Sequence, residues 1–270
     1  MTPSMLGVTQ PSRQASAAGA ALRMHGLTRR FGALVAVDDV TFSAETGRIT
    51  AVIGPNGAGK STLFGLIAGA LVPDAGTVRL FGNDLGAAPP HVRARLGLAR
   101  TFQAAIPFPN MTVQENVMVG MHRQFRAGLW QHFLGLRPAA EEEAVLRTHA
   151  GECLAAMGLE ALRHTPASVL TAGQQRLLAV ARAVAGQPEV LMLDEPAAGL
   201  NESERAMLAQ AVRALRSRGM TILLIEHAMD FVMELADHIV VLNHGVKLAE
   251  GSPAEIRRDP EVVAAYLGID

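Results

Sequence analysis

Short apolar runs recur along the chain, and each ends in a glycine or in charged residues. They are RITAVIG at 48–54, EVLMLDE at 189–195 and MTILLIEH at 220–227. Segments with helical spacing alternate with these runs, beginning at Lys60 after the first of them. Strand-like runs that alternate with helices are typical of a mainly parallel sheet with helices on its faces. The pattern therefore predicts an α/β fold.

The strand-like runs stop between about residues 103 and 172. The segment PAAEEEAVLRTHAGECLAAMGL at 138–159 instead carries apolar residues at steps of three and four, with charges between them. We expect a helical subdomain at 103–172, inserted into a core formed by 22–102 and 173–270. Residues 1–21 are rich in Ala, Ser, Gly, Thr and Pro and are predicted to be a disordered tail, since Arg13 and polar residues interrupt any signal-like apolar block.

Composition narrows the class of protein. The 270 residues are 49% hydrophobic, with 24 basic and 25 acidic side chains, which is typical of a globular chain with a sizeable core. A net charge of -1 offers no basic field for nucleic acid, so we expect no nucleic-acid partner. Apolar runs such as MTILLI fall short of the roughly 18 residues that span a bilayer. The single cysteine, Cys153, is read as a core residue.

A glycine-rich loop, GPNGAGKST at 54–62, follows the first apolar run. It fits the template G-x-x-x-x-G-K-[ST], in which glycines let backbone N–H groups approach phosphate oxygens at the start of a helix. Lys60, one of only two lysines, would bring a compact charge to the phosphates, and Ser61 could ligate Mg²⁺. A glycine-rich turn with a chance Lys-Ser pair is the alternative. The loop alone does not choose between a kinase, a GTPase and an ATPase.

Two downstream segments add chemistry. VLMLDEP at 190–196 is a strand that ends in two carboxylates, placing Asp194 to hold the Mg²⁺ shell and Glu195 to activate a water. A chance acidic strand end is the alternative. Just upstream, LTAGQQRLLAVARAVAGQPE at 170–189 is a glycine turn that opens an amphipathic helix.

Together these segments resemble the nucleotide-binding subunit of ATP-binding cassette (ABC) transporters over about 22–268. Gln103 in RTFQ resembles the family's glutamine loop, LTAGQ its signature, AAGLN its loop at the dimer seam, and His227 its switch histidine. The resemblance implies a phosphate-loop NTPase core with an N-terminal antiparallel β portion and the inserted helices. It assigns nucleotide binding to Phe31, Gly54, Pro55, Asn56, Gly57, Ala58, Gly59, Lys60, Ser61, Thr62, Gln103 and Asp194.

The resemblance also implies ATP hydrolysis with Mg²⁺. The metal would be held by Ser61, Gln103 and Asp194, the last through water. Glu195 resembles the general base that polarises the attacking water, and His227 would contact the γ-phosphate. A core phenylalanine is the alternative for Phe31, which otherwise resembles the aromatic that stacks on adenine.

A second cassette chain, identical or a paralogue, is implied to share each ATP with this one. The signature Thr171, Ala172, Gly173 and Gln174 would act across the dimer, with Asn201 at the seam. Thr171 and Gly173 stand at a helix start and could bind a phosphate from elsewhere, whereas a plain N-cap would explain Thr171 alone. Here threonine and alanine replace the family's common serine and glycine, and Asn201 replaces its aspartate.

Further partners follow from the family's architecture. Two membrane permease subunits and, indirectly, an external solute-binding protein would place the chain at the cytoplasmic face of a bacterial inner membrane. The segment AAIPFPNMTVQENV at 104–117 is expected to dock on a permease, with Phe108 exposed; burial of Phe108 within the helices is the alternative.

Three details resemble the branched-chain amino acid branch of importers: EPAAGLN, the insert at 122–145, and the ending GSPAEIRRDPEVVAAYLG, which should form a short helix. Relatives of this branch carry urea, amides or aromatic acids as well. A non-transport cassette protein is a rival, although this chain has one cassette and no sustained heptads. A soluble phosphate-loop kinase is a second rival, but it has no use for a signature.

Overall fold

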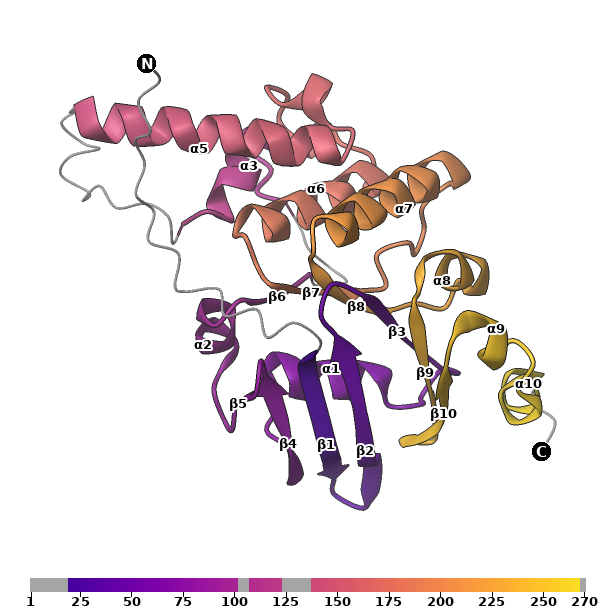
Figure 1. The fold of residues 1–270 in the computed structure, drawn as a ribbon. Helices are drawn as coiled ribbons and strands as arrows, with labels where there is room; N and C mark the ends of the chain where they lie inside the picture. The colour runs from indigo at the N-terminus through magenta and orange to yellow at the C-terminus, as the bar shows by residue number, and fades with distance from the viewer. Residues whose placement is uncertain (1–18, 102–106, 123–136, 268–270) are drawn as a thin grey trace.

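The computed structural model describes residues 19–101, 107–122 and 137–267. Their strands form two sheets (Figure 1). The larger sheet has six strands in the order β10-β9-β3-β8-β7-β6, of which all but β10 run parallel. Its strands are β3 Ile49–Ile53, β6 Leu98–Arg100, β7 Val190–Asp194, β8 Thr221–Ile225, β9 His238–Asn243 and β10 Val246–Gly251.

The smaller sheet is antiparallel and has the order β2-β1-β4-β5. Its strands are β1 Ala20–Phe31, β2 Leu34–Glu45, β4 Ala75–Leu80 and β5 Asn83–Asp84. The expected mainly parallel sheet and N-terminal antiparallel portion are thus confirmed. The predicted boundary after residue 21 is too late, because Ala20 already belongs to β1 and Ala21 is buried. The rest of the predicted tail, residues 1–18, lies outside the described residues.

Alternating residues of the parallel strands enter two separate cores. In β3, Val52 packs with α1 (Lys60–Ala68) and the antiparallel sheet, so that α1 lies between the two sheets. Ile49, Ala51 and Ile53 face the opposite core. Because both faces are covered, these strands are apolar throughout. The loop after β3 therefore begins between two packed layers.

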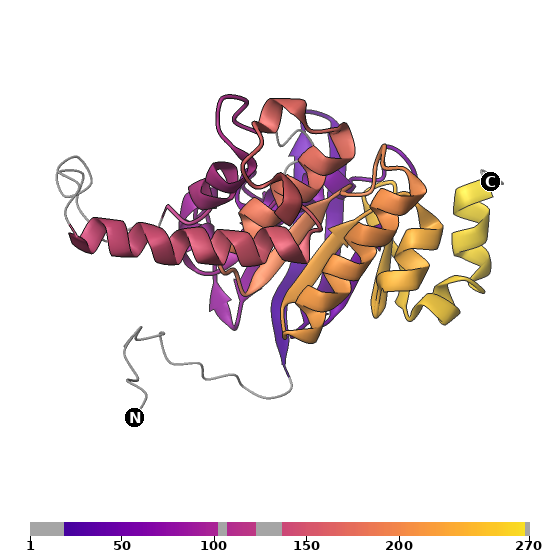
Figure 2. The ribbon, with the colours of Figure 1, turned by 90° about the horizontal axis from the view of Figure 1, so that it is seen from above.

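Helices form the layer over the second face (Figure 2). They are α3 Val113–Val119, α5 Arg137–Ala156, α6 Ala172–Ala185, α7 Glu202–Ser217 and α8 Met229–Leu235, with short turns at Glu160–Leu162 and Ala167–Val169. Although we expected the core to resume at residue 173, α6 packs chiefly against α3 and α5 and only lightly on β6 and β7. Buried apolar side chains of α6 belong to the same core as those of α3, α5 and the parallel strands.

The remaining helices are short. They are α2 Pro90–Arg95 beside β6 and, near β10 at the C-terminal end, α9 Pro253–Ile256 and α10 Pro260–Leu267. The expected C-terminal helix is therefore present. Cys153 lies in the core, where burial raises its pKa to about 11, as suits a structural cysteine. Within the described ranges, no helix combines the length and the hydrophobicity that crossing a membrane would require.

Candidate nucleotide site

The phosphate loop at 54–62 runs from the end of β3 to the first turn of α1 and is packed too closely for side chains at two glycines. Gly54 has φ 152°, and a Cβ there would lie 2.1 Å from the carbonyl oxygen of Leu242 in β9. Gly59 has φ 96°, and its Cβ would lie 2.3 Å from the carbonyl oxygen of Ala36 in β2. Both sheets therefore clamp the loop, which fixes the direction of its N–H groups.

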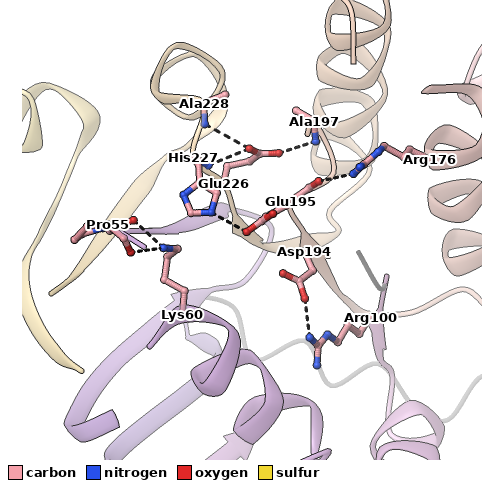
Figure 3. A network of polar contacts seen from close by, with 11 residues as sticks. Pro55, Lys60, Arg100, Arg176, Asp194, Glu195, Ala197, Glu226, His227 and Ala228 are labelled. Atoms are coloured by element: carbon pink, nitrogen blue, oxygen red, sulfur yellow. Dashed lines mark hydrogen bonds and ion pairs between the residues drawn. The ribbon is translucent and has the colours of Figure 1, made fainter. Parts of the chain in front are cut away.

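Lys60 reaches back across this loop (Figure 3). Its Nζ donates to the carbonyl oxygens of Gly54 at 2.7 Å and Pro55 at 2.8 Å, and the residue is only 5% exposed. Burial lowers the pKa of the Lys60 ammonium, while the charge of Glu195 acts in the opposite direction. The N-terminus of α1 has no side-chain cap and no acidic residue in its first turn. Its N–H groups and the ammonium together suit an anion.

The two clamped glycines lead to a prediction. Gly59→Ala should lower the free energy of unfolding by more than about 2 kcal/mol, because backbone strain is joined by a clash with a carbonyl that cannot yield. Gly57 provides the matched control, since it has φ 81° but no atom within 4 Å of its added Cβ. Gly57→Ala should lose about 1 kcal/mol, the strain alone. Denaturant titration of both variants measures the difference, and equal losses would contradict the clamp.

Asp194 ends β7 and is nearly buried, at 7% exposure. Its Oδ2 accepts a 2.6 Å hydrogen bond from Nη2 of Arg100, the last residue of the neighbouring strand β6 (Figure 3). The guanidinium of Arg100 also lies 5.9 Å from the ring centroid of Phe64. The sequence reasoning missed Arg100. Its position three residues before Gln103 carried no signal, because the pairing depends on β6 lying beside β7.

Glu195 and His227 contact each other directly, although 32 residues separate them. Nε2 of His227 lies 2.7 Å from Oε1 of Glu195. The contact follows from the sheet, since Asp194 pairs in register with Ile225 and the residues after each strand end are therefore neighbours. Glu195 has φ 47°, a strained value that is common at functional sites. Its carbonyl accepts from Nη1 of Arg176 in α6 at 2.9 Å.

A further carboxylate, Glu226, lies beside this pair and was not predicted. It is 2% exposed, and Oε1 accepts from the N–H of Ala197 at 2.6 Å. Oε2 accepts from the N–H of His227 at 3.0 Å and lies 3.5 Å from that of Ala228 (Figure 3). An acidic residue that directly ends an apolar strand was the available signal in the sequence.

The signature residues open α6. Thr171 is its N-cap and forms a capping box with Gln174; Ala172 is exposed, and Gly173 is buried. The hydroxyl of Thr171 also donates to Oε1 of Glu204 at 3.2 Å, and a Cβ on Gly173 would lie 2.1 Å from the same carboxylate. The N-cap interpretation of Thr171 is thus confirmed, and its contact with a phosphate stays a prediction.

Glu204 connects the signature to the seam loop, residues 197–201. Asn201 is the N-cap of α7, and Glu204 completes its capping box by accepting from the Asn201 N–H at 3.1 Å. One carboxylate therefore contacts the first turns of both α6 and α7. Sequence reasoning had not connected Glu204 with the signature, because 33 residues separate it from Thr171.

The other candidate residues are Phe31, the remaining residues of the phosphate loop and Gln103. Phe31, at the end of β1, is 44% exposed, so it is not a core residue, and the guanidinium of Arg29 lies 4.9 Å from its ring centroid. Asn56, Gly57 and Ser61 are exposed, Pro55 and Thr62 are half-buried, and Ala58 is buried. Gln103 lies outside the described residues.

The oxygen donors of the site fit a magnesium ion better than a transition metal. Ser61 supplies a hydroxyl and Asp194 a carboxylate, and no group of three His, Cys, Asp or Glu side chains gathers anywhere in the described part of the chain. Mg²⁺ typically takes one or two protein ligands and completes its shell with water and substrate phosphates. The donor set is therefore adequate for Mg²⁺ beside a nucleotide.

Comparison with known proteins agrees with this geometry. The ABC transporter family profile matches residues 37–198, and a profile described as branched-chain amino acid ATP-binding cassette transporter matches residues 246–270. The branched-chain amino acid transport ATP-binding protein BraF of Pseudomonas aeruginosa is 44% identical over 92% of this chain and 97% of its own. LivG of Escherichia coli K12, with the same description, is 42% identical over the same shares.

A solved ABC transporter cassette in its ADP conformation superposes with a TM-score of 0.81, at 33% identity, over 93% of this chain and all of its own. Its likeness extends over both sheets and the helical layer. The chain therefore belongs to the ABC transporter family, within its branched-chain amino acid branch, and is an ATPase.

Proposed function

We propose that this ATPase powers a membrane importer for branched-chain or related amino acids. The observation that carries the proposal is the arrangement in which Lys60, Asp194 and the Glu195–His227 pair meet at the ends of adjacent parallel strands. The similarity to BraF supports branched-chain amino acids as the transported solutes. The chain would work at the cytoplasmic face of a bacterial inner membrane, with two permease subunits and an external solute-binding protein.

Phosphate binding would exchange bonds that the loop now makes internally. The Lys60 ammonium donates to two carbonyls of its own loop. When ATP binds, the ammonium would donate instead to the β- and γ-phosphate oxygens, which the N–H groups of α1 would also face. Phe31 would stack on adenine. Ser61, Asp194 and Gln103 would hold Mg²⁺, which neutralises charge on the phosphates when it is bound.

Hydrolysis would then use the strand-end pair. Glu195 accepts a proton from a water molecule as the oxygen of that water attacks the γ-phosphorus. The bond between the γ-phosphorus and the bridging oxygen breaks, and ADP leaves with that oxygen on its β-phosphate. The His227 tautomer protonated at Nε2 donates to Oε1 of Glu195 and so fixes the carboxylate. Once nucleotide is bound, His227 would contact the γ-phosphate. The half-buried position of Glu195 favours a base sheltered from bulk water.

A second cassette chain would complete each site. The Thr171 hydroxyl and the Gly173 N–H lie in the first turn of α6, where the hydroxyl now donates to Glu204. The phosphate that would replace this partner would come from ATP bound to the second chain. Asn201 would lie at the seam. ATP shared across an interface stabilises the assembled state, so binding would drive the two chains together.

The docking segment for a permease centres on Phe108. Its backbone is held by Asn116 of α3, which accepts from the Phe108 N–H at 2.8 Å and donates to its carbonyl at 3.1 Å. The side chain is 45% exposed, and the guanidinium of Arg182 in α6 lies 5.7 Å from its ring centroid. An exposed phenylalanine on a rigid backbone suits an anchor in a protein interface. The alternative of a core phenylalanine does not hold.

Phe108→Glu tests this coupling. We expect the basal ATPase rate to stay within about twofold, because the ring contacts Arg182 of α6 and none of the nucleotide-site residues that the structure describes. Transport of labelled leucine into vesicles containing the permeases should fall by at least about tenfold. Val246→Glu is the matched control: its side chain is 42% exposed on β10, at the other edge of the sheet from β6. Transport that survived Phe108→Glu would remove this segment from the coupling path.

A further inference from the structure

We propose that Glu226 is a positioning residue that ties the switch histidine to the seam loop and so sets the geometry of the Glu195–His227 pair. This role rests on the hydrolysis mechanism proposed above. Glu226 directly follows β8 but has no part in the phosphate binding or proton transfer described above.

The carboxylate of Glu226 is buried and fully engaged with backbone. Its Oε1 takes the N–H of Ala197, and its Oε2 takes that of His227, at 2.6 and 3.0 Å. A carboxylate that is 2% exposed among apolar strands is strongly unfavourable unless its oxygens accept hydrogen bonds. The desolvation cost of the buried carboxylate is offset by hydrogen bonds from N–H groups of two different loops.

These contacts close a ring. The chain runs from Glu195 to Ala197, crosses by a hydrogen bond to Glu226, continues to His227, and returns through the 2.7 Å contact to Glu195. Figure 3 shows Glu226 at the side of the ring opposite the Glu195 carboxylate. A closed ring of two short peptide segments and two hydrogen bonds leaves His227 little freedom to turn away from Glu195.

The ring also contains the first residue of the seam loop. Ala197 leads through this loop to Asn201, the N-cap of α7. A displacement of the loop by a partner chain would shift the Ala197 N–H, and Glu226 would pass that shift to the backbone of His227. The catalytic pair would thus be aligned by the surface that meets the partner, which couples hydrolysis to assembly.

The chemistry of the contact requires a carboxylate. A glutamine of the same shape has one acceptor oxygen and one NH₂ group, so in either orientation it would turn a donor toward the N–H of Ala197 or of His227. Glu226→Gln therefore loses one of the two hydrogen bonds by which the carboxylate holds the N–H groups of Ala197 and His227, while preserving volume.

Purified Glu226→Gln should bind ATP with a Kd within about twofold of the unmodified chain, because the phosphate loop is untouched. Its kcat should fall by about 10- to 100-fold, since misplacing a catalytic group by about 1 Å can reduce the rate by that factor. The ring ¹⁵N signals of His227 should also shift toward those of an unconstrained imidazole. Glu202→Gln, in the exposed first turn of α7, is the control for removal of one negative charge.

A double-mutant cycle separates positioning from general damage. If Glu226 acts through His227, Glu226→Gln should reduce kcat by less than about threefold in a His227→Ala background. Full additivity of the two substitutions would overturn the proposal, as would an unchanged kcat or a global loss of folding and ATP binding in Glu226→Gln. An unmodified chain without ATPase activity would instead contradict the hydrolysis mechanism itself.

Discussion

Replacing Lys60 with alanine should abolish ATP binding and hydrolysis while the fold persists. The substitution removes the ammonium that the phosphate loop holds in place, and each charge-assisted hydrogen bond to a phosphate contributes about 1.5–3 kcal/mol. Loss of two such bonds weakens affinity by about 10²-fold or more. Calorimetric titration with ATP measures the loss, and far-ultraviolet circular dichroism checks the fold.

The chain provides a close control for this experiment. Lys247 is its only other lysine; it lies on β10, where its ammonium pairs with Glu250 at 3.1 Å. Lys247→Ala should leave ATP affinity and hydrolysis unchanged. If Lys60→Ala behaved like Lys247→Ala, the interpretation of 54–62 as a phosphate loop would be untenable.

Local sequence patterns predict those parts of the site that consecutive residues form. The phosphate loop follows from glycine spacing, and its setting between a strand and a helix follows from the apolar pattern. The contact between Glu195 and His227 required a further step, because it depends on β7 and β8 being neighbours in register. The resemblance implied only that His227 would contact the γ-phosphate, so its contact with Glu195 was not predicted.

The residues that were missed make contacts across long separations with no periodic signal. Arg100 reaches Asp194 from the next strand, Glu226 holds two loops, and Glu204 spans two helix termini. A charged side chain in a sequence is by default a solvated one. A structural role for a charged side chain becomes visible only from its burial or its partner in the folded chain. The residues next to it in the sequence indicate neither.

The departures from the family's usual signature have a structural explanation. Thr171 and Asn201 are both N-caps, and threonine and asparagine cap helices in the same way as the serine and aspartate they replace. Ala172 is exposed in the first turn of α6. The first turns of α6 and α7 are thus preserved in a form that could still face a partner.

Glu195→Gln should reduce the ATPase rate by about 10²- to 10⁴-fold while ATP binding is retained, because the amide cannot accept the proton of the attacking water. The substitution is isosteric, and its carbonyl oxygen can keep the contact with His227 that the carboxylate makes at 2.7 Å. ATP should then remain bound and hold two cassette chains together. Steady-state hydrolysis, ATP titration and light scattering with and without ATP measure the three effects.

Glu189→Gln is the matched control, since Glu189 directly precedes β7 and so lies at the opposite end of that strand from the site. It should leave hydrolysis and ATP-dependent association as they are in the unmodified chain. Rapid hydrolysis by Glu195→Gln would assign the base to another group. Association should be tested with the chain alone and with its co-expressed cassette partner. If Glu195→Gln lost hydrolysis but showed no ATP-dependent association in either test, Glu195 would remain the base, and the shared site at Thr171 and Gly173 would be contradicted.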